Sequence, residues 1–594
     1  MPRSSIRLAL AVAGLGATLS APALAQDQTV KTPTARGTGG AAASVDKLAT
    51  DAAIAELRKG GNAVDAAVTA AGVLGVVEPF SCGVGGGGFM VIRTPHGKVT
   101  TIDGREKAPR VMKPDSFWEN GKPLTFNDAR FSGISAGVPG TPLTWARALG
   151  RYGTISLKRA LRPGEGVATR GFQVDQTFYN QVNDVRDYFD DVPSTAALYL
   201  DPDSTPKDVG TTITNPDMAK TYRIMGRKGA RAGFYRGSVA AATAQAAAHP
   251  PINSNANHTW RQGLMTTDDL RRYSAPERKP VVSRYRGYKV FGMGPPSSGG
   301  STVAEVLNIL SGYEPVGNSR IQILHRLLEA SRYAFADRGA YVADPAFFNV
   351  PLEGLTSMSF AAERRALIND AAAAKSPVGP GNPYDDQGSS GSASSASVDV
   401  SHPRQSTTHL VVVDKHGMMV SYTFTIESIG GNAVTVPGYG FLLNNELTDF
   451  NYDDSTFKTA NRPEGSKRPR SSMSPTLITK GGKPFLAVGS PGGSTIIGTV
   501  LGILVHRLDM HDPLPASIAA PRAVERNTPT AQAEQSFIDS PEGRALTAMG
   551  HRFAPPPAPG EIGAATGIEI HGKRLTAAAE PQRRGIGSAA VVSP

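Results

Sequence analysis

The junction before Thr407 constrains the fold of this chain more than any other feature. Residues 389–397 read Ser-Ser-Gly-Ser-Ala-Ser-Ser-Ala-Ser, a composition that cannot build a hydrophobic core. Thr407 then opens a β-type run that continues through residues 410–413. If the chain were cut before Thr407, the freed α-amine could serve as base for the hydroxyl of the same residue, which would make Thr407 an N-terminal nucleophile. The alternative interpretation of residues 376–406 is an interdomain linker.

The first 25 residues have the pattern of a secretory signal peptide. Arg3 and Arg7 precede an apolar run over residues 8–19, and Ala23-Leu24-Ala25 forms an A-x-A cleavage signal before Gln26. A membrane helix is the alternative, but spanning a bilayer takes about 20 apolar residues. We therefore predict an exported protein, periplasmic or secreted, without a membrane anchor.

Composition excludes several classes of protein. The single cysteine, Cys82, permits neither an intramolecular disulfide nor a CxxC zinc motif. The net charge of +11 comes from basic residues scattered along the sequence, without the basic block or interleaved aromatic residues typical of nucleic-acid binding. We expect no nucleic-acid partner and no metal or organic cofactor.

Helical and strand patterns alternate along the chain, which supports a mixed α/β domain. Residues 26–40 lack a hydrophobic pattern and are predicted to be a disordered tail, so order is expected from residue 41. Helices are predicted over residues 45–59 and 63–77, followed by a hairpin of residues 89–92 and 99–103. A second hairpin is predicted to pair residues 410–413 with 418–426. In its second strand Thr423 and Thr425 face one side, so one of them is placed to hydrogen-bond the Thr407 hydroxyl. Simple β-propensity explains such a pair equally well.

Three motifs are set aside. The glycines of residues 83–88 precede a strand and lack the Gly-Lys-Ser/Thr ending of a phosphate loop, which favours tight backbone packing. Residues 133–137 match G-x-S-x-G, but Val138-Pro139-Gly140 follows where a nucleophile elbow needs a helix. His325 and Glu329 share a helix face without a third metal ligand and are interpreted as surface or packing residues.

A set of motifs, in this order, resembles one family over most of the chain. They are Gly60-Gly61-Asn62-Ala63-Val64-Asp65-Ala66-Ala67, residues 85–89, Asp103-Gly104-Arg105-Glu106-Lys107-Ala108-Pro109, Gly137-Val138-Pro139-Gly140-Thr141, Pro295-Pro296-Ser297-Ser298-Gly299-Gly300, Thr407-Thr408-His409, Leu443-Asn444-Asn445, Ser471-Ser472-Met473-Ser474-Pro475-Thr476 and Gly489-Ser490-Pro491-Gly492-Gly493. The sequence resembles the γ-glutamyltransferases, also called γ-glutamyl transpeptidases, of the N-terminal-nucleophile hydrolase superfamily.

The resemblance implies a four-layer αββα sandwich built from two subunits of one precursor. The large subunit would have its core in residues 41–375 and a flexible low-complexity end in residues 376–406, and the small catalytic subunit would be residues 407–594. Thr407 would attack the carbonyl of Ser406 and release the two subunits, which would stay together as a heterodimer.

The resemblance also implies roles for site residues. Thr407 would attack the γ-glutamyl amide of glutathione or a related donor and pass the acyl group to water, an amino acid or a peptide. Gly492 and Gly493 would donate backbone N–H groups to the oxyanion, and Thr425 would assist Thr407. The substrate α-carboxylate would be held by Arg105, Ser471 and Ser472. Its α-ammonium would be held by Asp449, Glu427 and Glu446.

Two departures from the family pattern bear on substrate choice. Only 20 residues separate Phe450 from Ser471, fewer than in members that close a lid over the pocket. Arg470 replaces a leucine common before the paired serines and adds positive charge near the pocket. Two other functions stay open: a cephalosporin or glutaryl acylase of the same fold, and an exported amino-acid-binding protein without turnover.

Overall fold

The computed structural model describes residues 31–314, 319–389, 391, 393, 406–557 and 559–593. The predicted signal peptide, residues 26–30 of the predicted tail and residues 394–405 of the low-complexity segment lie outside the described residues. Among the described helices, none has the length and apolarity needed to cross a membrane.

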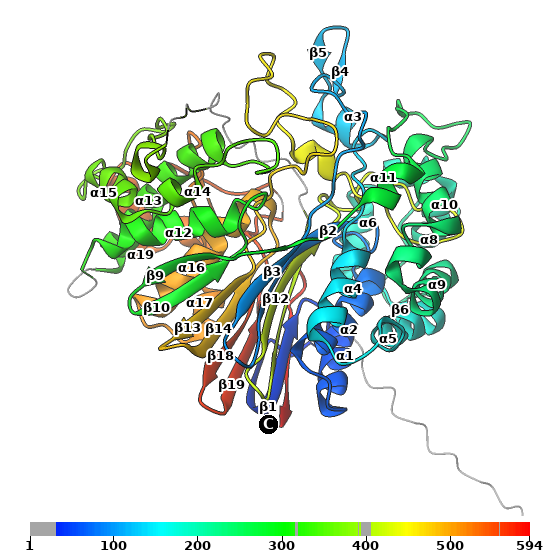
Figure 1. Cartoon of the computed structure of the whole chain (residues 1–594), viewed down its shortest axis with the longest axis horizontal. Coiled ribbons are helices and arrows are strands. Elements are labelled where there is room, and N and C mark those ends of the chain that lie inside the picture. Colours follow the sequence, from blue (N-terminus) through cyan, green and yellow to red (C-terminus); the bar gives the residue numbers. More distant parts are fainter. Residues whose placement is uncertain are drawn as a thin grey trace, which may run out of the picture.

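A 13-stranded sheet runs through the centre of the molecule, and all its pairings are antiparallel (Figure 1). In spatial order the strands are β8 (Glu277–Arg278), β3 (Val99–Gly104), β2 (Gly87–Arg93), β12 (Met419–Thr425), β11 (Thr408–Asp414), β1 (Thr34–Ser44), β19 (Arg574–Ala579), β18 (Thr566–His571), β14 (Lys483–Gly489), β13 (Thr476–Lys480), β10 (Tyr288–Gly292) and β9 (Val281–Tyr285), with β20 (Ser588–Ser593) beside β1. Strands from both sides of the predicted cleavage position therefore pair in one sheet.

Helices flank the strands on two sides (Figure 1). One group is α1 (Lys47–Arg58), α2 (Ala63–Val77), α4 (Thr141–Tyr152), α5 (Leu157–Arg170), α6 (Gln176–Asn183), α8 (Pro193–Tyr199), α9 (Pro216–Gly233), α10 (Gly237–Ala248) and α11 (Thr267–Arg272). The other is α12 (Gly299–Ser311), α13 (Arg320–Tyr341), α14 (Leu352–Leu355), α15 (Met358–Ala366), α16 (Ile496–Leu508), α17 (Leu514–Ala519) and α19 (Pro541–Ala548).

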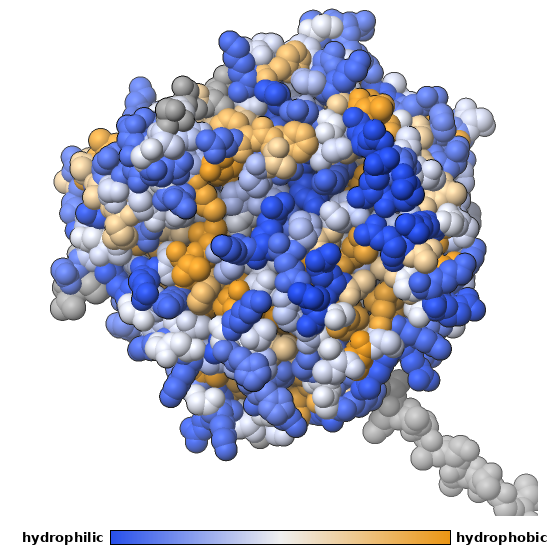
Figure 2. Space-filling model, viewed as in Figure 1, coloured by the Kyte–Doolittle hydropathy of each residue, from blue (hydrophilic) through white to orange (hydrophobic). Residues whose placement is uncertain are grey.

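Strand β11 shows how the core is divided. Leu410 and Val412 belong to a large apolar cluster with helices α1 and α2, whereas Val411 and Val413 point into a separate cluster. That second cluster also takes residues from β13, β14, β18 and β19, at the other half of the strand order. A third cluster packs β13 and β14 against α12, α13 and α16. In the space-filling view, apolar residues on the visible face form separate patches among polar ones (Figure 2).

The local predictions around the first helices and hairpins are confirmed. Helix α1 starts after its N-cap Asp46, and α2 starts after Asn62, whose side chain forms a capping box with Asp65. Strands β2 and β3 form the first predicted hairpin, and β11 and β12 form the second.

The predicted disordered tail is wrong from Thr34 onward, because strand β1 begins there. Its first residues pair with β19, and Gly40 pairs with Asp414 of β11. The polar, glycine-containing sequence carries no hydrophobic period of its own. Its order comes from hydrogen bonds to strands more than 350 residues away in the sequence, which local composition does not reveal.

The predicted flexible segment is also wrong over residues 376–389. Tyr384 is 3% exposed and lies in an apolar cluster with Tyr341 and Phe360. The backbone N–H of Gly381 donates to Asp337, and its carbonyl accepts from the Tyr341 hydroxyl. One buried aromatic residue and specific polar contacts order a stretch whose average composition predicts none.

The three motifs set aside have structural roles. A Cβ on Gly85 or Gly86 would lie 1.9 Å from a backbone carbonyl oxygen, which confirms close packing. Ser135 is buried and donates to the carbonyls of Arg130 and Ser132. His325 and Glu329 are buried packing residues, and the described residues contain no cluster of three or more His, Cys, Asp or Glu side chains suited to a metal.

Candidate active site

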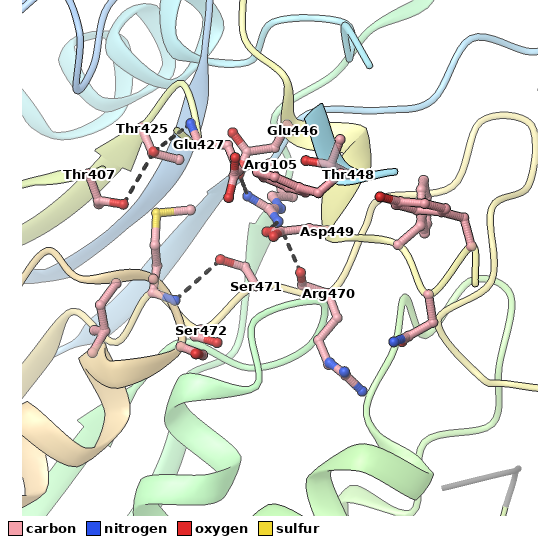
Figure 3. A pocket seen from close by; sticks show the side chains of 18 of the residues that line it. Arg105, Thr407, Thr425, Glu427, Glu446, Thr448, Asp449, Arg470, Ser471 and Ser472 are labelled. Carbon is pink, nitrogen blue, oxygen red and sulfur yellow. Dashed lines mark hydrogen bonds and ion pairs between the residues drawn. The ribbon is translucent and has the colours of Figure 1, made fainter. Parts of the chain in front are cut away.

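A cavity of about 300 Å³ lies where several strands of the large sheet start or end. Strand β3 ends just before Arg105, β12 ends at Thr425, and β11 begins just after Thr407. Lining residues that were predicted from the sequence are Arg105, Ser406, Thr407, Thr425, Glu427, Glu446, Asp449, Ser471, Ser472 and Gly493. Ligand pockets in proteins start at about this volume. The structure therefore brings almost the whole predicted set together (Figure 3).

The bond between Ser406 and Thr407 is buried and surrounded by hydroxyl groups. The Thr407 Oγ1 lies against the Ser406 carbonyl oxygen and 3.2 Å from the Thr425 Oγ1. The Thr425 hydroxyl donates to the same carbonyl oxygen at 2.9 Å and accepts from the Glu427 N–H at 2.8 Å. One hydroxyl lies against the Ser406 carbonyl and a second hydroxyl donates to its oxygen. Of the two threonines considered, Thr425 is the one at Thr407, whereas Thr423 binds His409.

Arg584 holds both sides of this bond and was missed from the sequence. Its Nη1 donates to the Thr407 carbonyl at 2.8 Å, and its Nη2 donates to the hydroxyls of Ser81 and Ser406 at 2.9 and 3.2 Å. Ser81 lies between α2 and β2, and Arg584 lies between β19 and β20. Nothing in the local sequence marks either residue, because their proximity arises from the strand order.

The opposite wall of the cavity is charged. Arg105 is completely buried, and its guanidinium contacts the carboxyl groups of Glu446 and Asp449, with Glu106 at 3.9 Å (Figure 3). It also donates to the carbonyls of Pro469 and Arg470 at 3.1 and 2.9 Å. Arg105 is predicted to bind the substrate carboxylate, and Glu446 and Asp449 are predicted to bind the substrate ammonium. In this structure the three residues contact one another.

Burial shifts the protonation of these carboxyl groups. Loss of hydration raises the pKa of Glu427 to about 7, with the negative charge of Asp449 acting in the same direction. Burial also raises the pKa of Glu106 to about 7 and the pKa of Glu446 well above its ordinary value. The neighbouring carboxyl groups raise the pKa of Arg105 despite its burial, so the guanidinium keeps its charge. The wall holds a fixed positive charge among carboxyl groups whose ionisation is disfavoured by burial.

Ser471 and Ser472 lie across the cavity from Thr425, just before β13. The Ser471 hydroxyl accepts from the Met473 N–H at 3.2 Å, and the Ser472 hydroxyl accepts from Arg338 Nη2 at 2.7 Å. Gly493 lines the cavity in the turn that follows β14. Gly492 is not among the lining residues, and its carbonyl accepts from the Thr495 N–H at 3.1 Å.

Arg470 lines the cavity, but its guanidinium is directed away from Arg105 (Figure 3). It donates to the carbonyls of Arg338, Gly339 and Val342 at the end of α13, at 3.3–3.4 Å. A cation there favours the carbonyl end of a helix. The sequence predicted a positive charge near the pocket. In the structure the guanidinium binds the carbonyl end of α13.

Comparison with known proteins decides the family. The sequence profile described as Gamma-glutamyltranspeptidase matches residues 49–590. The chain belongs to the γ-glutamyltranspeptidase family. A member from Bacillus subtilis (strain 168), named glutathione hydrolase proenzyme, is 36% identical over 545 residues, which cover 90% of this chain and 88% of the relative. The glutathione hydrolase proenzyme of Escherichia coli (strain K12) is 34% identical and covers 82% of this chain and 81% of the relative.

A solved structure with the same architecture extends the comparison. The cephalosporin acylase from Bacillus halodurans superimposes with a TM-score of 0.80 at 26% identity, covering 94% of this chain and 97% of that chain. The γ-glutamyltranspeptidase family membership makes this chain an enzyme, and the resemblance seen in the sequence motifs is confirmed.

Proposed function

We propose that this γ-glutamyltranspeptidase cleaves itself before Thr407 and then transfers γ-glutamyl groups from glutathione and related donors to water, amino acids or peptides. The observation that carries the proposal is a buried threonine hydroxyl against the preceding carbonyl, in the same cavity as a charged wall suited to an α-amino acid head group. The printed names of the relatives from B. subtilis and E. coli support glutathione as a donor.

Self-cleavage follows from the hydroxyl network. The Thr407 Oγ1 adds to the Ser406 carbonyl carbon, the hydroxyl proton passes to the Thr407 nitrogen, and the C–N bond breaks to leave an ester. Thr425 donates to the carbonyl oxygen and stabilises the negative charge that develops on it. Breaking the C–N bond frees the Thr407 amine, and water then hydrolyses the ester, which frees the Thr407 hydroxyl and leaves a carboxylate on Ser406. The ordinary pKa of an α-amine is about 8, so cleavage creates a base that the amide nitrogen of the precursor is not.

In turnover the freed amine takes the proton of the Thr407 hydroxyl as the oxygen attacks the γ-glutamyl amide. The amide C–N bond breaks, the leaving amine receives the proton, and a γ-glutamyl ester of Thr407 remains. Water or an acceptor amine attacks that ester and regenerates the hydroxyl. Gly492 and Gly493 serve as the oxyanion donors in this proposal, supported by the position of Gly493 at the cavity.

The electrostatics of the charged wall favour a zwitterionic head group. Arg105 is positive, Asp449 is its exposed-side partner, and burial favours a protonated Glu446. A γ-glutamyl donor brings one carboxylate for Arg105, Ser471 and Ser472, and one ammonium for Asp449, Glu427 and Glu446. Its binding adds no net charge to the pocket, which limits the cost of burying charge.

We also propose that the chain works as a heterodimer of residues 26–406 and 407–594 in a four-layer αββα sandwich, after export. Three apolar clusters support that arrangement. Two of them each lie between strands and one of the two helix groups, and the third is shared by both halves of the strand order. Strands from both products interleave in the sheet, which supports their staying together after cleavage.

An acylase acting on cephalosporin-type or glutaryl amides is the second candidate, favoured by the whole-chain likeness to the B. halodurans acylase. A glutaryl group carries the carboxylate but no ammonium. It would bring no ammonium to Asp449 and Glu427 and would add a negative charge to the pocket, at a cost in desolvation. Comparing glutaryl-p-nitroanilide with γ-glutamyl-p-nitroanilide separates the two candidates, and we expect the γ-glutamyl donor to react faster.

The test of the proposed function uses purified wild type and Thr407→Ala. Wild type is expected to give fragments of about 40 and about 20 kDa, in proportion to the lengths of residues 26–406 and 407–594 in a 62.2 kDa chain of 594 residues. It should cleave γ-glutamyl-p-nitroanilide, and faster with glycylglycine if transfer contributes. The variant should stay in one piece and be inactive, and an active variant would overturn the proposal.

A further inference from the structure

We propose that Arg338 is a positioning residue for the donor carboxylate, acting through the hydroxyl of Ser472. Arg338 lies in α13, more than 130 positions before Ser472 in the sequence, and on the other side of the proposed cleavage site. It lines the cavity and is 3% exposed. This inference rests on the proposed function and names a residue that orients the recognition site.

The contacts of Arg338 tie the segment of Ser471 and Ser472 to the start of α12. Its Nη2 donates to the Ser472 hydroxyl at 2.7 Å, and its Nε donates to the Ser298 hydroxyl at 2.8 Å. The Ser298 hydroxyl in turn donates to the Ser471 carbonyl at 2.8 Å, and the Ser298 N–H donates to the same carbonyl at 2.7 Å. One guanidinium therefore fixes the start of α12 against the serine pair.

The Arg338 guanidinium sets the direction of the Ser472 hydroxyl proton. A serine hydroxyl has one proton and two acceptor positions, and a guanidinium donates hydrogen bonds but accepts none. Because Arg338 occupies an acceptor position of Ser472, the hydroxyl proton must point elsewhere. The partly exposed Ser472 lies at the cavity, so its proton is available to a substrate carboxylate.

Ser471 offers a comparison. Its hydroxyl accepts from the Met473 backbone N–H two residues along the chain, so its orientation is set locally and by a neutral donor. Ser472 is oriented by a permanent positive charge from a distant helix. Charge-assisted hydrogen bonds are about twice as strong as neutral ones, so Arg338 both orients the Ser472 hydroxyl and polarises it toward an anion.

The test compares three p-nitroanilide donors that differ only in the head group. The γ-glutamyl donor has carboxylate and ammonium, the glutaryl donor has the carboxylate alone, and the 4-aminobutyryl donor has the ammonium alone. For Arg338→Met we expect kcat/KM to fall by about 10- to 100-fold for both carboxylate donors, mainly through KM, and by less than about twofold for the 4-aminobutyryl donor. In a Ser472→Ala background the effect of Arg338→Met should largely disappear, because Arg338 acts through the Ser472 hydroxyl.

Arg332→Met is the matched control. Arg332 lies in the same helix, is 4% exposed and binds Glu329 and Glu525 away from the described cavity lining. Its loss should lower thermal stability and change the three donors by the same factor. Each variant is examined by gel electrophoresis for self-cleavage before its kinetics are measured.

Equal losses on all three donors, or no loss on any, would overturn the role of Arg338. If Arg338→Met does not mature, Arg338→Lys is measured against the same ratio of donors, and failure of both to self-cleave assigns Arg338 to folding instead. If wild type itself does not cleave the γ-glutamyl donor, it is the proposed function that fails. The two failures are therefore distinguishable.

Discussion

The two ends of the cavity are built in opposite ways. At the reacting end, the neutral hydroxyls of Thr407 and Thr425 lie across one hairpin of adjacent strands, and the Arg584 guanidinium donates to the Thr407 carbonyl. The recognition end is a buried guanidinium among carboxyl groups, Arg105 with Glu446 and Asp449, supplied by segments more than 300 residues apart. Hydrogen bonds between neighbouring strands can position a hydroxyl beside a carbonyl. Binding a charged head group requires buried charges that the fold brings together from distant segments.

Thr425→Val is expected to give the largest effect and to act on the reacting end alone. Valine keeps the shape but removes the donor to the Ser406 carbonyl and the acceptor for the Glu427 N–H. Loss of an oxyanion donor typically costs about 10²–10³ in rate. Self-cleavage, followed by gel electrophoresis over time, should slow by that order. Any matured enzyme should lose activity on all donors equally.

Thr423→Val is the control for that prediction. Thr423 lies two residues earlier on β12, and its hydroxyl binds His409 rather than the cleavage site. Self-cleavage at the wild-type rate in Thr425→Val, or an equal delay in Thr423→Val, would contradict the assigned difference between the two threonines.

Asp449→Asn is expected to act on the recognition end alone. The amide keeps the shape but removes the negative charge that Asp449 offers to the substrate ammonium, which typically costs about 1.5–3 kcal/mol, or roughly 10- to 150-fold in kcat/KM. Self-cleavage should proceed normally, and the glutaryl donor should not be impaired. Asp453→Asn, a change to an exposed carboxylate that lines the same cavity, should have little effect. Equal loss on γ-glutamyl and glutaryl donors would remove Asp449 from ammonium binding.

Glu427→Gln is expected to change how stability depends on pH. The folded-state pKa of Glu427, about 7, lies above its ordinary value of 4.5, so its contribution to stability is complete below pH 4.5 and is lost as pH rises through 7. Glutamine cannot ionise and escapes this loss. The variant should therefore gain stability relative to wild type, by roughly 1–3 kcal/mol between pH 5 and pH 8. Thermal unfolding at both pH values checks this, and a difference that does not change with pH would contradict the raised pKa.

Arg470→Leu is expected to give the smallest effect. The buried guanidinium faces the carbonyl end of α13, so its loss should lower stability by about 1–2 kcal/mol. Its effect on the KM of γ-glutamyl-p-nitroanilide should stay within about twofold. Thermal unfolding and steady-state kinetics together make the test. A tenfold change in KM without loss of stability would return Arg470 to the charged recognition end.

The sequence predicted the reacting end better than the recognition end. The hairpin around Thr407 follows a two-residue period, which placed Thr423 and Thr425 on one face but did not distinguish between them. Arg338 at the recognition end and Arg584 at the reacting end carry no local signal, because each reaches the site through strand order or helix packing. The contact of Arg105 with Asp449 was likewise invisible, although both residues were named from the family resemblance.

The same limit explains the errors in the fold. Composition describes what a segment can bury by itself. It does not describe the burial and pairing that other segments provide. Tyr341 and Phe360 pack against Tyr384, and strands β11 and β19 pair with β1. Polar segments that pair with distant strands are therefore the places where sequence analysis failed.

The most direct test of the central claim is to identify the atom that carries the acyl group. Wild-type enzyme is quenched in acid during turnover of γ-glutamyl-p-nitroanilide, and the small fragment is sequenced and mapped by mass spectrometry. The account predicts a fragment that begins at Thr407, with one γ-glutamyl group as a base-labile ester on that residue. A fragment that begins elsewhere, or a γ-glutamyl group on another side chain, would contradict it.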